Sequence, residues 1–288
     1  MAVTGATPDD SYPIIDVADW IAEESEGIGA RTKQWMSDPQ GPGTQPELLL
    51  KYARSEGLPR FGADLCAEVI ASRIASHLGF PALHMDFAIN HGVRGVVSRR
   101  MSGNLVLGDV LLGNSPTGYD GIPYVEQLRR IREVLEPFGG SEEGLTGWES
   151  FVGQLVLDTL IANTDRHAEN WAVDADKGRL LPCFDHGASL GFNATDRDHL
   201  SGVLQYARRG RSRPFGAKIL RVAREGLLQV SPTVADLWLG RVEALGRASL
   251  EEIVQRVPNG WMSDPSRTFA VELVWENRRR LLEWPTYR

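Results

Sequence analysis

The sequence predicts an α+β protein of two lobes, with an antiparallel sheet in the N-terminal lobe and mainly helices in the C-terminal lobe. Short apolar runs separated by turn residues fill residues 1–100 around one amphipathic helix, whereas residues 101–288 mostly follow a helical period. A length of 288 residues suffices for one large domain or for two lobes that share a cleft. We expect the lobes to divide near residue 100.

A polar motif in the second lobe predicts phosphoryl-transfer chemistry. A helix-like apolar run ends in NTDRHAEN (residues 163–170), and a second apolar run leads to Asp185. In protein-kinase-like folds one Asp positions or deprotonates the acceptor hydroxyl, while an Asn and a second Asp hold Mg²⁺ on the ATP phosphates. Asp165, Asn170 and Asp185 fit these three roles and predict a protein-kinase-like fold that binds ATP and Mg²⁺. The alternative is an ordinary polar loop, because Asp and Asn are common in turns.

The first elements of the chain are consistent with a phosphate-binding sheet. Residues 13–17 form a strand-like run, and the polar turn that follows later contains Gly27 and Gly29. Glycines let backbone amides approach phosphates, although two glycines in a turn are a weak signal on their own. Lys51 lies in the next apolar strand, where it either holds the ATP phosphates or is a solvated, snorkelling side chain.

An amphipathic helix is expected over residues 64–77. Its apolar positions recur at helical spacing, and Gly79 and Pro81 mark its end. Glu68 lies within this helix. It either pairs with Lys51, as the Lys–Glu ion pair of kinases does, or is an exposed helix carboxylate.

A β-hairpin and a linker complete the first lobe. Strands are expected over residues 83–89 and 93–98, joined by the turn Asn90-His91-Gly92. Residues 96–101 then connect the lobes. In a kinase-like cleft the backbone of this linker, which includes Ser98 and Met101, is where an adenine ring would hydrogen-bond.

The second lobe reads as helices around the polar motif. Helical periods cover residues 124–138, 234–245, 250–257 and 269–282, and we find no candidate chemistry in the last three. Four arginines follow Asp185 by about the length of a kinase activation segment: Arg208, Arg209, Arg211 and Arg213. They are either a solvated basic loop or an acceptor-binding patch, because arginine forks bind phosphate and carboxylate bidentately.

The motif resembles the kinase core of the HipA-like serine/threonine kinases. The segments NTDRHAEN and FDHGASLG (residues 184–191) carry the resemblance, which extends from about Asp16 to Arg213. The catalytic segment is also similar to that of phosphoinositide kinases, in which the corresponding histidine is a candidate base. His167 therefore either assists Asp165 or is a hydrogen-bonded scaffold residue. The chain is shorter than full-length HipA-like toxins and is expected to lack their extra N-terminal subdomain, which leaves toxicity and an antitoxin partner open.

The resemblance implies transfer of the γ-phosphoryl group of ATP to a Ser or Thr hydroxyl of a protein. One alternative is a kinase of a small molecule such as an antibiotic, a metabolite or a lipid headgroup, because the fold does not fix the acceptor. Another is a catalytically silent module that binds a nucleotide or a partner. The presence of Lys51, Asp165, Asn170 and Asp185 argues against the silent module.

Composition limits the other functional classes. The net charge of −7 and the pI near 5.5 argue against general nucleic-acid binding. Cys66 and Cys183 lie in apolar surroundings without metal-like spacing, which is typical of reduced packing residues. No segment is long and apolar enough to cross a membrane, and residues 1–12 lack the features of a signal peptide. We expect a soluble cytoplasmic protein.

Overall fold

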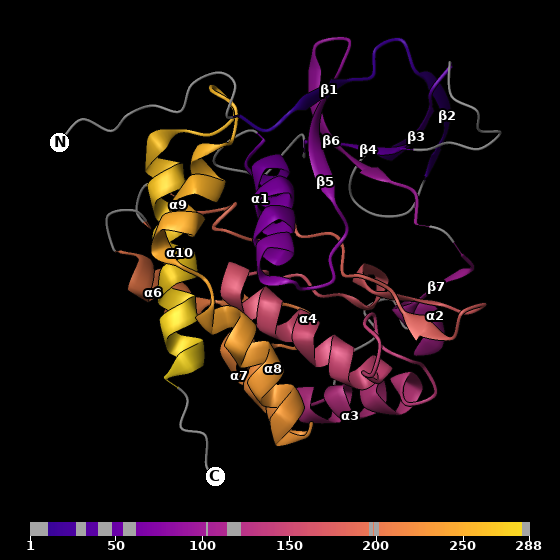
Figure 1. Ribbon diagram of the computed structural model, residues 1–288, viewed down its shortest axis with the longest axis vertical. Coiled ribbons are helices and arrows are strands. Elements are labelled where there is room, and N and C mark those ends of the chain that lie inside the picture. Colours follow the sequence, from indigo (N-terminus) through magenta and orange to yellow (C-terminus); the bar gives the residue numbers. More distant parts are fainter. Residues whose placement is uncertain are drawn as a thin grey trace.

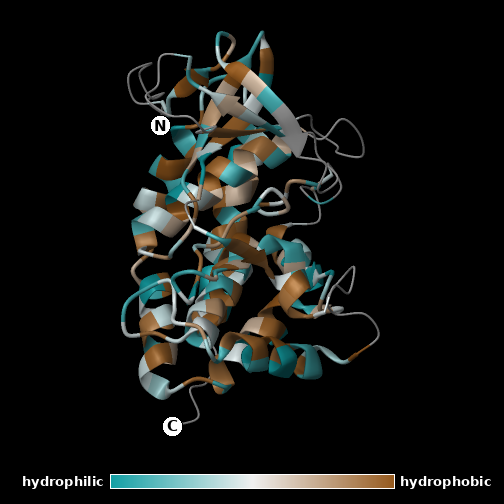
Figure 2. Cartoon of the chain, turned by 90° about the vertical axis from the view of Figure 1, so that its right-hand side faces the viewer, coloured by the Kyte–Doolittle hydropathy of each residue, from teal (hydrophilic) through white to brown (hydrophobic). Residues whose placement is uncertain are grey.

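The computed structural model describes residues 11–26, 33–39, 48–53, 62–101, 103–113, 122–195, 198 and 202–283. A six-stranded sheet forms one end of the molecule, and helices form the other (Figures 1 and 2). Hydrophobic and hydrophilic residues alternate along most ribbons, as expected for elements that bury one side (Figure 2).

The sheet has the strand order β1-β5-β6-β4-β3-β2. Its strands are β1 (Ile14–Asp16), β2 (Ile21–Glu26), β3 (Lys33–Ser37), β4 (Leu48–Tyr52), β5 (Met85–Asn90) and β6 (Val93–Arg99). All neighbouring pairs are antiparallel except β1 and β5, which run parallel. The expectation of an antiparallel sheet is therefore correct for five of its strands. The edge strand β1 is the exception, because it runs parallel to its neighbour β5.

The predicted hairpin is confirmed. The strands β5 and β6 pair from Asn90 opposite Val93 onward, which leaves a two-residue turn. His91 and Gly92 both have positive φ angles, of 46° and 80°, as the two central positions of a type I′ turn require.

Helix α1 (Ala63–Leu78) also confirms its prediction, within one residue at each end. It ends at Gly79, whose φ of 74° lets its amide cap the last turn. The helix is buried on nearly all sides, because it packs between the sheet and the C-terminal helices (Figure 1). The Cys66 thiol donates to the carbonyl of Trp261, at 3.3 Å, and thereby connects α1 to the far end of the chain.

The C-terminal half is helical, as predicted. Its helices are α2 (Gly108–Leu111), α3 (Tyr124–Leu135), α4 (Gly147–Ile161), the short 3-10 turn η2 (Ala168–Asn170), α6 (Val203–Arg209), α7 (Ile219–Leu228), α8 (Pro232–Glu243), α9 (Arg247–Gln255) and α10 (Asp264–Leu282). Helix α4 is central, because α3, α7, α8 and α10 all pack against it. A capping box between Thr146 and Glu149 begins α4. No helix among the described residues has the length and apolarity needed to span a membrane.

Two small sheets frame the loops of this half. One contains β7 (Leu105–Leu107), β8 (Ala172–Asp174) and β9 (Arg179–Leu180), and the other pairs β10 (Arg211–Ser212) with β11 (Ala217–Lys218). One continuous apolar core joins α1, β5 and β6 to the C-terminal helices. The division of the chain near residue 100 stays a prediction, since this core crosses it.

Candidate active site

The loop after α4 presents Asp165. The helix ends at Ala162, whose φ of 56° turns the chain back. The Asn163 side chain fixes this turn, because its Nδ2 donates to Asp158 Oδ1 (2.8 Å) and its Oδ1 accepts from the Asp165 amide (3.2 Å). The backbone at Asp165 is therefore anchored to the buried end of α4.

Arg166 connects three segments of the site. Its Nε and Nη2 donate to the two carboxylate oxygens of Asp158, at 2.8 and 2.7 Å, and both side chains are 2% exposed. Its Nη1 donates to the carbonyls of Asn170 and Phe184. One guanidinium thus holds the backbone at Asn170 beside the backbone that precedes Asp185. This role was not predicted from the sequence, although Asp158, a charged residue inside an apolar helical run, indicates a buried partner.

Asn170 is oriented by the loop itself. Its Nδ2 donates to the carbonyl of Asp165, at 2.6 Å, which leaves Oδ1 as the atom able to bind a metal. Asp185 has a φ of 58°, a left-handed conformation that Asp tolerates better than most residues. Asn170 is therefore oriented by a hydrogen bond within its own loop, whereas the residues on either side of Asp185 are held by Arg166 and Glu68.

Lys51, Glu68 and the Asp185 loop meet in the interior. Lys51 Nζ lies 3.4 Å from Glu68 Oε1 and 3.9 Å from Asp185 Oδ2, and its side chain is 4% exposed. The other oxygen of Glu68 accepts from the amide of His186, at 2.8 Å. The predicted Lys51–Glu68 contact is present, and the alternatives of a solvated lysine and an exposed helix carboxylate are excluded.

A cavity of about 630 Å³ lies between the sheet and the catalytic loop. Trp35 and Leu49 also line it, although neither was predicted as a site residue from the sequence. Seven of the predicted site residues line it: Lys51, Ser98, Met101, Asp165, His167, Asn170 and Asp185. Glu68 contacts Lys51 from behind the lining. Gly27 and Gly29 lie outside the described residues, and the four predicted arginines do not line this cavity.

The Asp165 carboxylate contacts the His167 ring, with 2.7 Å between Asp165 Oδ1 and His167 Nε2. Burial opposes the charge of Asp165, but His167 and the more distant Arg213 outweigh it, so the pKa of this carboxyl is lowered. Contact with Asp165 in turn raises the pKa of His167. The geometry therefore keeps Asp165 ionised at the cavity wall.

His186 is a scaffold residue. Its side chain is 1% exposed, and burial together with the nearby charge of Arg166 lowers its pKa to about 3. Its ring is therefore neutral near pH 7, and it does not line the cavity.

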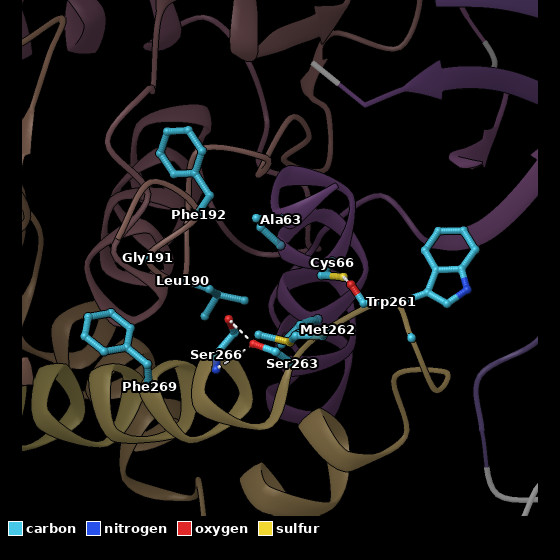
Figure 3. A pocket seen from close by; sticks show the side chains of 13 residues that line it. Ala63, Cys66, Leu190, Gly191, Phe192, Trp261, Met262, Ser263, Ser266 and Phe269 are labelled. Carbon is cyan, nitrogen blue, oxygen red and sulfur yellow. Dashed lines mark hydrogen bonds between the residues drawn. The ribbon is translucent and has the colours of Figure 1, made fainter. Parts of the chain in front are cut away.

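A second cavity, of about 340 Å³, lies on another side of α1 (Figure 3). Apolar side chains such as Leu190, Phe192 and Phe269 line it, and its polar groups already contact one another. Burial raises the pKa of the Cys66 thiol, which also lines it, to about 12. The thiol is therefore unreactive, and we assign no chemistry to this cavity.

Comparison with known proteins identifies the fold. No protein-family model matches the sequence, and no curated protein matches it. Among solved structures, the Helicobacter pylori proinflammatory kinase CtkA is similar with a TM-score of 0.66 and 17% identity, over 94% of this chain and 99% of CtkA. The HipA toxin of Shewanella oneidensis, solved with HipB and operator DNA, gives a TM-score of 0.54 and 12% identity, over 92% of this chain and 66% of HipA.

These similarities confirm the predicted fold. Both neighbours are similar along nearly the whole of this chain, so the likeness extends beyond the residues that carried the sequence resemblance. The chain has the two-lobed, protein-kinase-like α+β fold of HipA-like kinases. At 17% and 12% identity the likeness concerns the fold, and function has to be argued from the site.

Proposed function

We propose that this protein is an ATP- and Mg²⁺-dependent kinase that phosphorylates a Ser or Thr hydroxyl of a protein. One observation carries the proposal: a buried lysine, held by Glu68, and the residues Asp165, Asn170 and Asp185 all face one cavity of about 630 Å³. A purely structural loop needs no such arrangement, in which a buried cation, two carboxylates and an amide surround an open cavity.

The donor set fits Mg²⁺. Asp185 supplies a carboxylate and Asn170 an amide oxygen, which are the hard oxygen ligands that Mg²⁺ prefers, with its remaining positions left for water and phosphate. Arg166 holds the two backbone segments together. When bound, Mg²⁺ would neutralise the charge of the phosphate oxygens.

Each side chain of the cavity then has a defined task. Lys51 binds phosphate oxygens of the nucleotide, and Glu68 keeps the lysine in place. Asp165 orients the acceptor hydroxyl and takes its proton while the acceptor oxygen bonds to the γ-phosphorus and the bond to ADP breaks. We assign adenine binding to the linker backbone at Met101, which borders the same cavity. Ser98, predicted for the same role, lies inside strand β6, where its backbone pairs with β4 and β5, so that prediction is wrong.

The test is incubation of the purified protein with labelled ATP and Mg²⁺, alone and with cell extract. We expect the wild-type protein to label itself or to hydrolyse ATP, and the Asp165→Asn variant to do neither. If the wild-type protein also does neither, the protein is a silent module. Label on extract proteins supports a protein acceptor, whereas label on metabolites would overturn that part of the proposal.

The metal ligands give a separate prediction. Asp185→Ala should weaken Mg²⁺-dependent ATP binding more than Asn170→Ala does, because a carboxylate is the stronger ligand for a hard cation. Calorimetric titration of ATP with and without Mg²⁺ measures this difference. If both variants keep the full effect of Mg²⁺ on ATP affinity, the metal ligands lie elsewhere.

The pH profile tests the partnership of Asp165 and His167. His167→Gln removes the group that lowers the pKa of Asp165, while burial still raises it, so this pKa should rise. The acidic limb of kcat/KM should then move to higher pH, because Asp165 must be ionised to accept a proton. Were His167 itself the base, the variant would lose its turnover across the whole profile instead.

A further inference from the structure

A third cavity, of about 360 Å³, lies beside the catalytic loop. Thr164 lines it, and the next residue, Asp165, lines the candidate nucleotide cavity. Consecutive residues of the catalytic loop therefore line the two cavities. The rest of the third cavity comes from the end of α4, the loop before α6, α6 with the segment that leads to α7, and the end of α10.

The lining of this cavity, which we call the arginine pocket, is strongly basic. Four guanidinium groups belong to it, from Arg209, Arg211, Arg213 and Arg280, against the single carboxylate of Asp198. Such an excess is unexpected in a chain with a net charge of −7. Arg208, which the sequence placed in the same patch, is exposed on α6 and lies outside the lining. Arg280 was not expected from the sequence.

Two of these arginines have partners of their own. Arg209 pairs with Asp198 Oδ1, at 2.5 Å, and Arg280 Nη1 donates to the carbonyl of Ala207 (2.9 Å) and to Asn277 Oδ1 (3.1 Å). Burial lowers the pKa of Arg280, and although Glu276 opposes this shift, the cations Arg224 and Arg208 act in the same direction as burial. An anion placed in the pocket would relieve this crowding of positive charge.

The other two are better placed to receive a ligand. Arg211 donates to the carbonyl of Gly216 through Nη2, which leaves its remaining N–H groups available. Arg213 is exposed, and its side chain makes no ion pair within the described part of the chain. Its amide donates to the carbonyl of Thr164, at 2.9 Å, so its backbone is attached to the catalytic loop.

We propose that the arginine pocket binds an anionic side chain of the acceptor protein and so places the Ser or Thr hydroxyl at Asp165. This proposal rests on the proposed function. Phosphate and carboxylate both suit an arginine fork. The nucleotide phosphates already have Lys51 in the other cavity, so the pocket is not needed for them. An acceptor that reaches both Thr164 and Asp165 from separate cavities has to be extended, as a peptide segment is.

The experiment uses pools of Ser-containing peptides in which one neighbouring position is fixed as phosphoserine, Glu, Ala or Lys. Wild-type protein should phosphorylate the phosphoserine and Glu pools best and the Lys pool least. The double variant Arg211→Gln, Arg213→Gln should raise KM for the anionic pools by about tenfold or more, because bonds to charged groups are the strong ones. Its ATP KM should not change.

A matched control is Arg221→Gln, which removes an equally exposed charge on α7 outside the pocket lining. It should leave KM for every pool unchanged, and thermal melting should show that both variants are folded. Equal KM values for the anionic and Ala pools in the wild type would overturn the pocket assignment while leaving the kinase proposal intact.

A binding measurement separates the two proposals if no pool is phosphorylated. Fluorescence anisotropy with a labelled phosphoserine peptide, a Glu peptide and an Ala peptide reports on the pocket without catalysis. Tighter binding of an anionic peptide than of the Ala peptide, lost in the double variant and at raised salt, supports the pocket. The affinities of the phosphoserine and Glu peptides then show whether the pocket prefers phosphate or carboxylate. Equal affinity for all three peptides would overturn the pocket as a site for an anionic side chain. If free phosphoserine competed as strongly as the phosphoserine peptide does, an acceptor protein as the ligand would be overturned.

Discussion

Asp165→Asn is expected to reduce phosphoryl transfer by about 10²–10⁴-fold, which is the usual cost of losing a positioned base. The substitution preserves the shape of the side chain and removes its charge. Asp165 faces the cavity from the loop tip, whereas Lys51, Asn170 and Asp185 are the groups assigned to the nucleotide and the metal. ATP affinity should therefore stay close to that of the wild type.

Single-turnover phosphorylation and calorimetric ATP titration measure the two quantities separately. Asp236→Asn on α8 is a suitable control, because it makes the same chemical change at an exposed position outside the cavity. Turnover of Asp165→Asn near the wild-type rate would remove Asp165 from the chemistry. A parallel loss of ATP affinity would instead place it among the nucleotide ligands.

The sequence was sufficient wherever the signal was local. The helical period of α1, the turn at His91 and Gly92, and the spacing of Asp165, Asn170 and Asp185 each lie within a short segment. Such patterns depend on the backbone and on the nearest neighbours, so they can be read before the fold is known.

The sequence was insufficient wherever distant segments decide the environment. Whether Glu68 pairs with Lys51 depends on how α1 packs against β4, and both alternatives were open until that packing was seen. The parallel pairing of β1 with β5 joins segments about 70 residues apart, which no local pattern specifies. The arginine pocket gains Arg280 from α10 and loses Arg208 for the same reason.

The ion pair between Asp158 and Arg166 should be the most costly single contact to break. Both side chains are 2% exposed, and Asp158 accepts from Arg166 at both oxygens. Arg166→Met would leave the buried carboxylate with Asn163 Nδ2 as a donor but without its cation, which typically lowers the free energy of unfolding by about 3–5 kcal/mol. Asp158→Leu should cost a similar amount, because it leaves the buried guanidinium unpaired on one side.

The double variant Asp158→Leu, Arg166→Met should recover much of this loss, since replacing a buried ion pair by apolar groups is often neutral. Urea unfolding of the two single variants and the double variant measures the coupling. Phosphoryl transfer should nevertheless stay low in the double variant, because the carbonyls of Asn170 and Phe184 have lost the donor that holds them together. Recovered stability with impaired transfer would show that the Asp158–Arg166 pair, in which Asp158 also holds Asn163, positions the catalytic loop. A loss of stability in the double variant equal to the sum of the two single losses, or recovery of both properties, would contradict that role.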